Sequence, residues 1–276
     1  MPLTKVSGEV IQRPLVITGN TSVTGILTVG IGSTTTTLDG TSNFPPIRPS
    51  LDFTFAASKT LDRRINFYRT SIGTYTDENG IIRTATNNVP RFDHDPVTGE
   101  CLGLLIEESR TNLATYSEDF STRSATIYGT KSSVTINSTI SPDGTQTADL
   151  VTTVSTVTQN RLGVSHSVVS GTVYTYSVYV KQANKSNVQF YLGYTSRINA
   201  FVEFTFSTET ITASGGTYVA NSAGFQKLNN GWYRIYFSGT AFSTGSTYSG
   251  FISDTTPNET FYIWGEQIEA GSSQPH

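Results

Sequence analysis

Apolar and polar residues alternate one by one over long parts of this chain. The segment Val173–Lys181, VYTYSVYVK, is the clearest case. In an extended strand its apolar side chains share one face: Tyr174, Tyr176, Val178 and Val180. Good helix formers nowhere cluster at a 3.6-residue spacing over a comparable window, and Thr, Tyr, Phe and Val are typical of strands. The sequence therefore predicts an all-β fold.

Four more segments after residue 128 have the same character, and Gly, Ser and Asn turns separate them: Val188–Tyr194, Ala200–Phe206, Gly231–Phe237 and Thr260–Ile268. We expect two of them to supply core faces with the following residues: Val188, Phe190, Leu192, Tyr194, Ala200, Val202, Phe204 and Phe206. Strands at this spacing predict an antiparallel jelly-roll sandwich over residues 111–276.

Charge and cysteine content exclude several classes of protein. The net charge is -3, only 14% of residues are charged, and the longest basic grouping is Arg63-Arg64. A pair of arginines is too little for a nucleic-acid interface. The single Cys101 permits no intramolecular disulfide. No apolar run approaches the length of a membrane span, and no secretory signal is evident. We expect neither a nucleic-acid partner nor membrane insertion.

Residues 1–42 differ from the rest because they lack aromatic residues and repeat short β pieces that end at Gly. Such pieces cannot bury an apolar side alone, but three chains wound together could. We expect a trimeric β stalk, or an arm that docks on another protein, through these residues: Val16, Ile17, Val23, Ile26, Leu27 and Val29. A flexible Thr/Ser/Gly linker is the alternative.

The Pro-rich stretch Asn43–Pro49 marks a boundary. We assign residues 43–110 to a small β-meander module. Its expected strands are Leu51–Phe55 and Ile65–Arg69, followed by a hairpin over Tyr75–Ile82 with Asn-Gly at the turn.

The end of this module has the densest mixture of charge and turn residues. Asp93-His94-Asp95-Pro96 and Thr98-Gly99-Glu100 precede the apolar run Leu102–Ile106. A catalytic Asp/His/Glu cluster is one interpretation. Asp, Pro and Gly at these places are also ordinary turn chemistry. Because no nucleophile or metal set accompanies them, we favour a turn followed by a buried strand.

Several motifs resemble a family of phage structural proteins that is common in phages of marine cyanobacteria. They are NVPRFDHDPVTGECLGLLIEESRTN at Asn88–Asn112, TYSVYVK at Thr175–Lys181, NNGWYRIYF at Asn229–Phe237 and YIWGEQIEAG at Tyr262–Gly271. The resemblance covers roughly residues 51–271 and implies a carbohydrate-binding-module-like jelly roll in a tail fibre or a capsid-surface protein. It implies a virion component without fixing the appendage.

The aromatic segment GWYRIYF holds the expected glycan site. Period two places Tyr233, Ile235 and Phe237 in the core. The opposite face contains the expected glycan-binding residues: Trp232, Arg234 and Tyr236. Large aromatic rings stack on sugars but are more often packed against protein. This face therefore binds sugar, contacts a subunit or another module, or is simply surface.

The last strand supplies further expectations. Trp264 should share a face with Tyr262, Glu266 and Ile268, and we expect it in the core. Jelly-roll carbohydrate modules often hold a structural Ca²⁺, and the resemblance implies that Glu118 and Asp119, with Glu266 or Glu269, could supply oxygen ligands for it. Solvated carboxylates are the alternative.

No motif predicts catalysis. The three histidines, His94, His166 and His276, are far apart, and no G-x-S-x-G or phosphate loop is present. We expect a non-enzymatic homotrimeric virion surface protein, attached to another virion protein through residues 1–42, without a cofactor other than the calcium. The alternative is an adhesin whose jelly roll binds host-surface glycan; a glycan depolymerase with paired carboxylates is a third reading.

Overall fold

The computed structural model describes residues 27–31, 34–38, 55–124, 129–194 and 197–271. The chain divides into two compact units, Met1–Asp52 and Phe53–His276. We predicted separate modules over residues 43–110 and 111–276, but from Phe53 onward both belong to one compact unit. The expected hinge at residues 43–49 lies outside the described residues.

The N-terminal unit contains one described hairpin. β1 (Leu27–Ile31) pairs antiparallel with β2 (Thr34–Leu38), and Val29 lies opposite Thr36. The expected attachment residues Val16, Ile17, Val23 and Ile26 lie outside the described residues, and Leu27 and Val29 lie in β1. A trimeric stalk stays a prediction.

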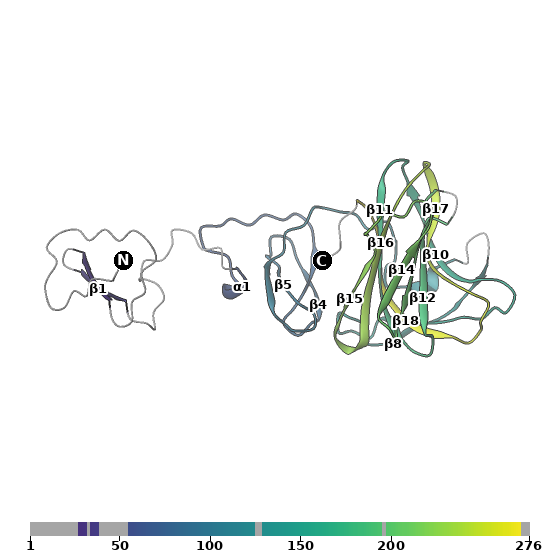
Figure 1. Ribbon diagram of the computed structural model, residues 1–276, viewed down its shortest axis with the longest axis horizontal. Helices are drawn as coiled ribbons and strands as arrows, with labels where there is room; N and C mark the ends of the chain where they lie inside the picture. Colours follow the sequence, from purple (N-terminus) through teal and green to yellow (C-terminus); the bar gives the residue numbers. More distant parts are fainter. Residues whose placement is uncertain (1–26, 32–33, 39–54, 125–128, 195–196, 272–276) are drawn as a thin grey trace, which may run out of the picture. The chain divides into compact units, whose positions relative to one another are not determined.

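The small module consists of one helical turn and two hairpins (Figure 1). Its elements are α1 (Phe55–Ser58), β3 (Gly73–Thr76), β4 (Ile82–Ala85), β5 (Phe92–His94) and β6 (Cys101–Leu104). β3 pairs with β4, and β5 pairs with β6. The expected strands differ: Phe55 begins a helical turn, and residues 65–69 form no strand.

Aspartate side chains shape both turns of the module. Asp77 Oδ1 accepts hydrogen bonds from the backbone N–H groups of Asn79 and Ile81 at 2.9 and 3.0 Å, which confirms the Asn-Gly hairpin. Asp95 Oδ1 likewise accepts from Val97 and Thr98 at 2.9 and 2.7 Å. Asp95 of the Asp-His-Asp motif is therefore turn chemistry. Asp93 and His94 instead lie in β5 and contact Thr76 of β3: Asp93 Oδ1 accepts from Thr76 N at 2.7 Å, and His94 Nδ1 lies 3.0 Å from Thr76 O.

The strand that follows this turn is not buried as expected. β6 covers only Cys101–Leu104, and Leu102 and Ile106 are 63% and 77% exposed. Within β6 the buried residue is Gly103, next to Phe55 and Ala56 of α1, and Leu102 lies at the surface.

Two six-stranded sheets form the sandwich. The first has the order β14-β13-β12-β17-β10-β7 and the second β15-β16-β11-β18-β9-β8. The strands of the first sheet are β7 (Thr130–Lys131), β10 (Asn160–Val168), β12 (Asn187–Leu192), β13 (Ala200–Thr205), β14 (Thr210–Ser214) and β17 (Gly245–Ser253). Those of the second are β8 (Ser133–Thr139), β9 (Ala148–Thr152), β11 (Val173–Gln182), β15 (Gly224–Lys227), β16 (Trp232–Thr240) and β18 (Thr260–Ala270). Short 3₁₀ turns lie at Phe120–Thr122 and Asn229–Gly231. The all-β sandwich is confirmed.

The core between the sheets follows the period-two pattern. All four expected residues of β11 are buried, and so are Tyr233, Ile235 and Phe237 of β16. Tyr194 is an exception, because β12 ends at Leu192 and Gly193 has φ +67°. Its ring instead packs edge-on against Tyr191 and Phe201.

One charged pair is buried inside this apolar sandwich. Arg123 and Glu266 are 2% and 1% exposed at their side chains, and Arg123 Nη2 lies 2.8 Å from Glu266 Oε2. Tyr176 Oη donates to Glu266 Oε1 at 2.7 Å. Burial raises the pKa of Glu266 even beside the guanidinium. Each charge therefore depends on the other to be tolerated in the core.

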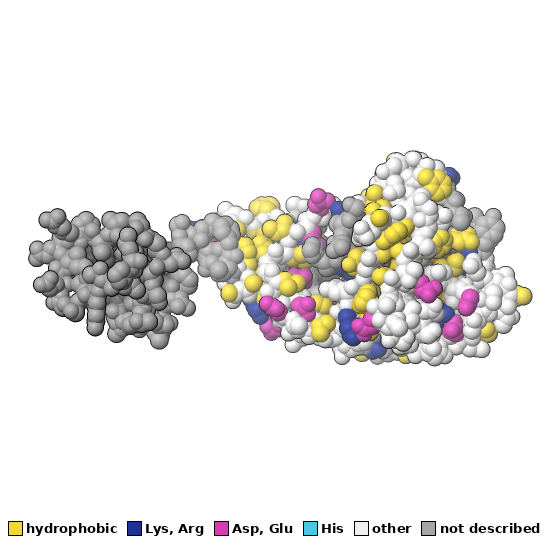
Figure 2. All heavy atoms as spheres, in the orientation of Figure 1, with side chains coloured by type: hydrophobic (Ala, Val, Ile, Leu, Met, Phe, Trp, Pro, Cys, Tyr) yellow, Lys and Arg dark blue, Asp and Glu magenta, His cyan; other side chains and the backbone are white. Residues whose placement is uncertain are grey.

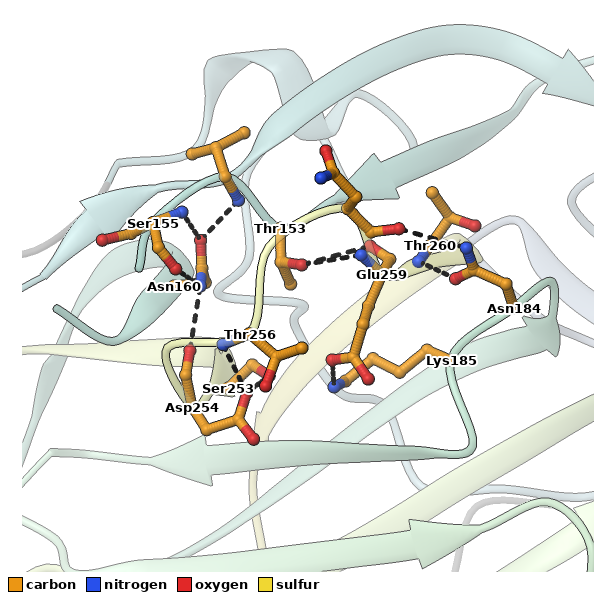
Figure 3. Close-up of polar contacts among 12 residues, drawn as sticks. Thr153, Ser155, Asn160, Asn184, Lys185, Ser253, Asp254, Thr256, Glu259 and Thr260 are labelled. Carbon is orange, nitrogen blue, oxygen red and sulfur yellow. Dashed lines mark hydrogen bonds and ion pairs between the residues drawn. The ribbon is translucent and has the colours of Figure 1, made fainter. Parts of the chain in front are cut away.

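A polar network fastens the loops at one end of the sandwich (Figure 3). Asn160 Oδ1 accepts from Val154 N and Ser155 N, and its Nδ2 donates to Asp254 O at 2.9 Å. Glu259 pairs with Lys185 and accepts at its carbonyl from Thr153 N. Since these polar groups bond one another, the network holds the loops at this end of the sandwich together.

In the part of the chain that the structure describes, no helix has the length and apolar character needed to span a membrane.

We predict that Arg123→Leu lowers the free energy of unfolding by about 3–5 kcal/mol, because it leaves a buried carboxylate without its counterion. The double variant Arg123→Leu/Glu266→Gln should regain most of that loss. Lys227→Leu, which breaks the exposed pair with Glu209, is the control and should cost about 1 kcal/mol or less. Urea unfolding measures all three; a loss for Arg123→Leu no larger than the control's contradicts the prediction.

Candidate functional site: a cleft between the small module and the sandwich

The outer face of the second sheet is covered by the chain's own small module. Trp232 is 2% exposed, and its Nε1 donates to Ile140 O at 3.1 Å. It packs in a second apolar cluster with Ala148, Leu228 and Trp264, and Ile82 of β4 packs against this cluster. Trp232 is therefore not an open sugar platform. Of the alternatives that the sequence left open, contact between modules is the one found.

Backbone and side-chain hydrogen bonds join the module to the sandwich beside this cluster. Ile82 N donates to Pro142 O at 3.0 Å. Asn112 donates from Nδ2 to Glu266 O and accepts at Oδ1 from Ile268 N, both at 3.0 Å. Arg110 Nη1 donates to Ala270 O. These bonds fix the position of the linking segment along β18.

A β-bulge in β18 turns Trp264 toward the module. Tyr179 of β11 lies opposite Trp264, but Ser177, two residues earlier, lies opposite Gln267. One extra residue is thus accommodated at Gly265, whose φ is +61°. The expectation that Trp264 shares the face of Glu266 and Ile268 is wrong. Trp264 is buried outside the sandwich core, while Glu266 and Ile268 point inward.

Module and sandwich together enclose a cleft of about 820 Å³. The sandwich wall includes Tyr179, Arg234, Trp264, Gln267 and Glu269, and Glu118 lies beside it. Two residues predicted for calcium, Glu118 and Glu269, therefore line the same cleft as Arg234, which was predicted for glycan. Tyr236 is half-buried and does not line it.

The module wall adds Arg69 and Arg91, which the sequence did not single out, and Asp93, which the sequence offered for a catalytic cluster or a turn. Tyr68, Ile72 and Ile106 also line the cleft and are 85%, 69% and 77% exposed. Figure 2 shows apolar side chains on the surface of this part of the chain, interspersed with acidic ones. The density of charge in residues 89–120 was the only sequence signal that pointed here.

The walls offer both donors and acceptors. Arg234 Nη2 donates to Gln267 Oε1 at 2.9 Å, and its guanidinium carbon lies 5.4 Å from the centre of the Tyr179 ring. Burial is the largest cause that raises the pKa of Glu118 and also that of Glu269. A cleft with such groups can bind a polar ligand through charge-assisted hydrogen bonds.

The four carboxylates predicted for calcium do not converge. Glu266 points into the core toward Arg123, and Asp119 Oδ1 accepts from Ser121 N at 3.0 Å at the start of a 3₁₀ turn. No group of three or more His, Cys, Asp or Glu side chains suited to a metal occurs among the described residues. Glu266 and Asp119 thus have partners within the protein, and a calcium site stays a prediction.

One serine–histidine pair has the contact expected of a nucleophile and its base. Ser249 Oγ lies 3.0 Å from His166 Nε2. Both residues are buried, and His166 Nδ1 has no hydrogen-bond partner among the residues that the structure describes. A buried pair whose imidazole is oriented by no third residue in the described segments lacks the arrangement of a catalytic nucleophile and its base.

Comparison with known proteins identifies no family. No protein-family model matches the chain, and no curated protein matches it. Among solved structures, one match is the structure of the CBM22-1–GH10 modules of Clostridium thermocellum endo-1,4-β-D-xylanase 10B complexed with xylohexaose. The match covers 62% of this chain and 30% of the xylanase chain, at 14% sequence identity and a TM-score of 0.34. The enzymatically active domain of bacteriophage CBA120 tailspike protein 4 matches 58% and 21%, at 9% identity and 0.33. The CBM22-1 xylan-binding domain of Paenibacillus barcinonensis Xyn10C matches 61% and 100%, at 14% identity and 0.32. The chain spans less than a third of the first two, and similarity at this level carries no argument about its ligand.

Burial lowers the pKa of His166 from 6.5 to about 4. Between pH 6.5 and about 4, His166 therefore binds a proton in the unfolded chain but not in the folded chain. This difference should make the folded protein less stable as the pH falls through that range. We predict that His166→Gln removes this part of the pH dependence. Unfolding free energies of both proteins at pH 7 and pH 5 measure it; the same loss in both contradicts the prediction.

Proposed function

We propose that the protein is a non-enzymatic surface protein of a phage particle. The Met1–Asp52 unit attaches it to another virion protein, and the Phe53–His276 unit projects outward and binds host-surface glycan. The motifs that resemble phage structural proteins support the virion location. The cleft between module and sandwich is the observation that supports glycan binding.

The composition of the cleft suits sugar hydroxyl groups. A hydroxyl both donates and accepts, and carboxyl, amide and guanidinium groups line the same walls: Glu118, Glu269, Gln267, Asn112 and Arg234. Apolar side chains at Tyr68, Ile72 and Ile106 can cover the C–H faces of a sugar ring. The proposed site differs from the one predicted from the sequence. Arg234 lines the cleft, whereas Trp232 is buried and does not line it, and residues of the module form the opposite wall.

We predict that the Phe53–His276 unit binds at least one glycan of a host-surface panel and that Arg234→Gln weakens this binding by about tenfold or more, since a hydrogen bond to a charged group is lost. Lys227→Gln, outside the cleft, is the matched control and should bind as the wild type does. Isothermal titration measures both. If no glycan binds, or if both variants bind equally, the cleft is not a glycan site; a release of reducing ends would instead indicate hydrolysis.

Attachment through the N-terminal unit has its own test. We predict that the full chain is a trimer and that a chain beginning at Pro46 is a monomer, because short Gly-punctuated strands need neighbouring chains to bury their apolar side. Native mass spectrometry measures both masses. Two trimers would place the oligomer contacts in the C-terminal unit, and two monomers would contradict the stalk.

A further inference from the structure

Two arginines of the small module converge on one point of the cleft wall. Arg69 Nη1 lies 2.7 Å, and Arg91 Nη1 lies 3.1 Å, from the position that a Cβ atom on Gly73 would occupy. The two nitrogens are therefore separated by no more than the sum of these distances, 5.8 Å. All three residues line the cleft. Like charges at this separation repel each other unless an anion lies near them.

The protein only partly compensates these charges. Arg91 Nη1 donates to Thr74 O at 2.8 Å and to Glu107 Oε2 at 2.5 Å. Arg69 Nη2 donates to three backbone carbonyls, those of Ala85, Thr86 and Val89. Carbonyl groups orient Arg69 but supply no full negative charge. Glu107 is thus the one carboxylate that forms an ion pair with either arginine among the described residues.

Several donors of the pair are left without a partner. Arg91 is 5% exposed, and its Nε, together with Nε and Nη1 of Arg69, has no hydrogen-bond partner in the described part of the chain. Burial and the charge of Arg91 lower the pKa of Arg69. An unpaired buried donor on a charged group is costly. An oxyanion at this wall would satisfy the donors and offset the repulsion.

We propose that Arg69 and Arg91 bind an acid group of the glycan, either a uronate carboxylate or a sulfate ester. This inference rests on the proposed function of the cleft. Planar guanidinium groups match both oxyanions. Gly73 is part of the subsite, because any side chain there would press against both guanidinium groups.

The rest of the cleft limits how acidic the ligand is. Asp93, Glu108, Glu118 and Glu269 also line it, and these carboxyl groups would repel a second negative charge. A uniformly anionic polymer is therefore a poor fit. The preferred ligand has one acid group beside neutral sugars, so that the acid lies at the arginine wall and hydroxyl groups face the carboxyl groups.

The test uses three disaccharides on the full chain: one glucuronic acid linked to a neutral sugar, its methyl ester, and the neutral disaccharide with one sulfate ester. We expect the uronate or the sulfate to bind about tenfold more tightly than the methyl ester, and their comparison identifies the acid. Gly73→Ala and Arg69→Gln should remove this preference, so that the acid and its methyl ester bind these variants equally. Arg64→Gln, an arginine of the same module that pairs with Asp62 outside the cleft, should preserve it.

Thermal unfolding of each variant checks that it is folded, and Gly73→Ala covers the case in which loss of Arg69 disturbs the module. Equal binding of acid and ester by the wild type, or a preference that both variants retain, overturns the anion subsite while the glycan cleft stands. Failure of all three sugars together with the whole glycan panel overturns the cleft as a glycan site, and the subsite with it.

Discussion

The bulge at Trp264 and Gly265 is the constraint on which the arrangement of module and sandwich depends. Before the bulge, Phe261 and Ile263 of β18 point into the core; after it, Glu266 and Ile268 do. A regular strand would have put Trp264 on the same face as Glu266. Because of the extra residue, Trp264 points to the outer face of the sheet while Glu266 points into the core. The positive φ of Gly265 allows this at little steric cost.

The second apolar cluster follows from this geometry. Trp264 and Trp232 lie together on the outer face of the sheet and are buried with Ala148 and Leu228, and Ile82 of the module packs against them. Apolar burial holds the module in place, while the hydrogen bonds of Asn112 and Ile82 fix its position. The cleft is the space left beside this contact, so its walls come from segments far apart in the sequence.

Period-two patterning predicted the sandwich well, because the alternation of apolar and polar residues within each strand shows which side chains face the core. The core faces of β11 and β16 are the expected ones, as is the turn at Gly80. The site was predicted less well. A bulge changes the parity of Trp264 without any marked change in composition, and the cover over Trp232 comes from residues about 150 positions earlier. Arg234, Glu118 and Glu269 were singled out for different ligands, and only the fold brings them to one cleft.

The small module lies over the tryptophan face of the sandwich, where Ile82 packs against the cluster of Trp232 and Trp264. The chain has two tryptophans, which are 2% and 7% exposed, and Ile82 of the module packs against the cluster that contains both. Acrylamide quenching of the intrinsic tryptophan fluorescence therefore reports on the contact directly. We expect weak quenching in the native protein and a marked rise in Ile82→Asp while the sandwich stays folded. Strong quenching of the native protein, typical of exposed indole rings, would contradict it.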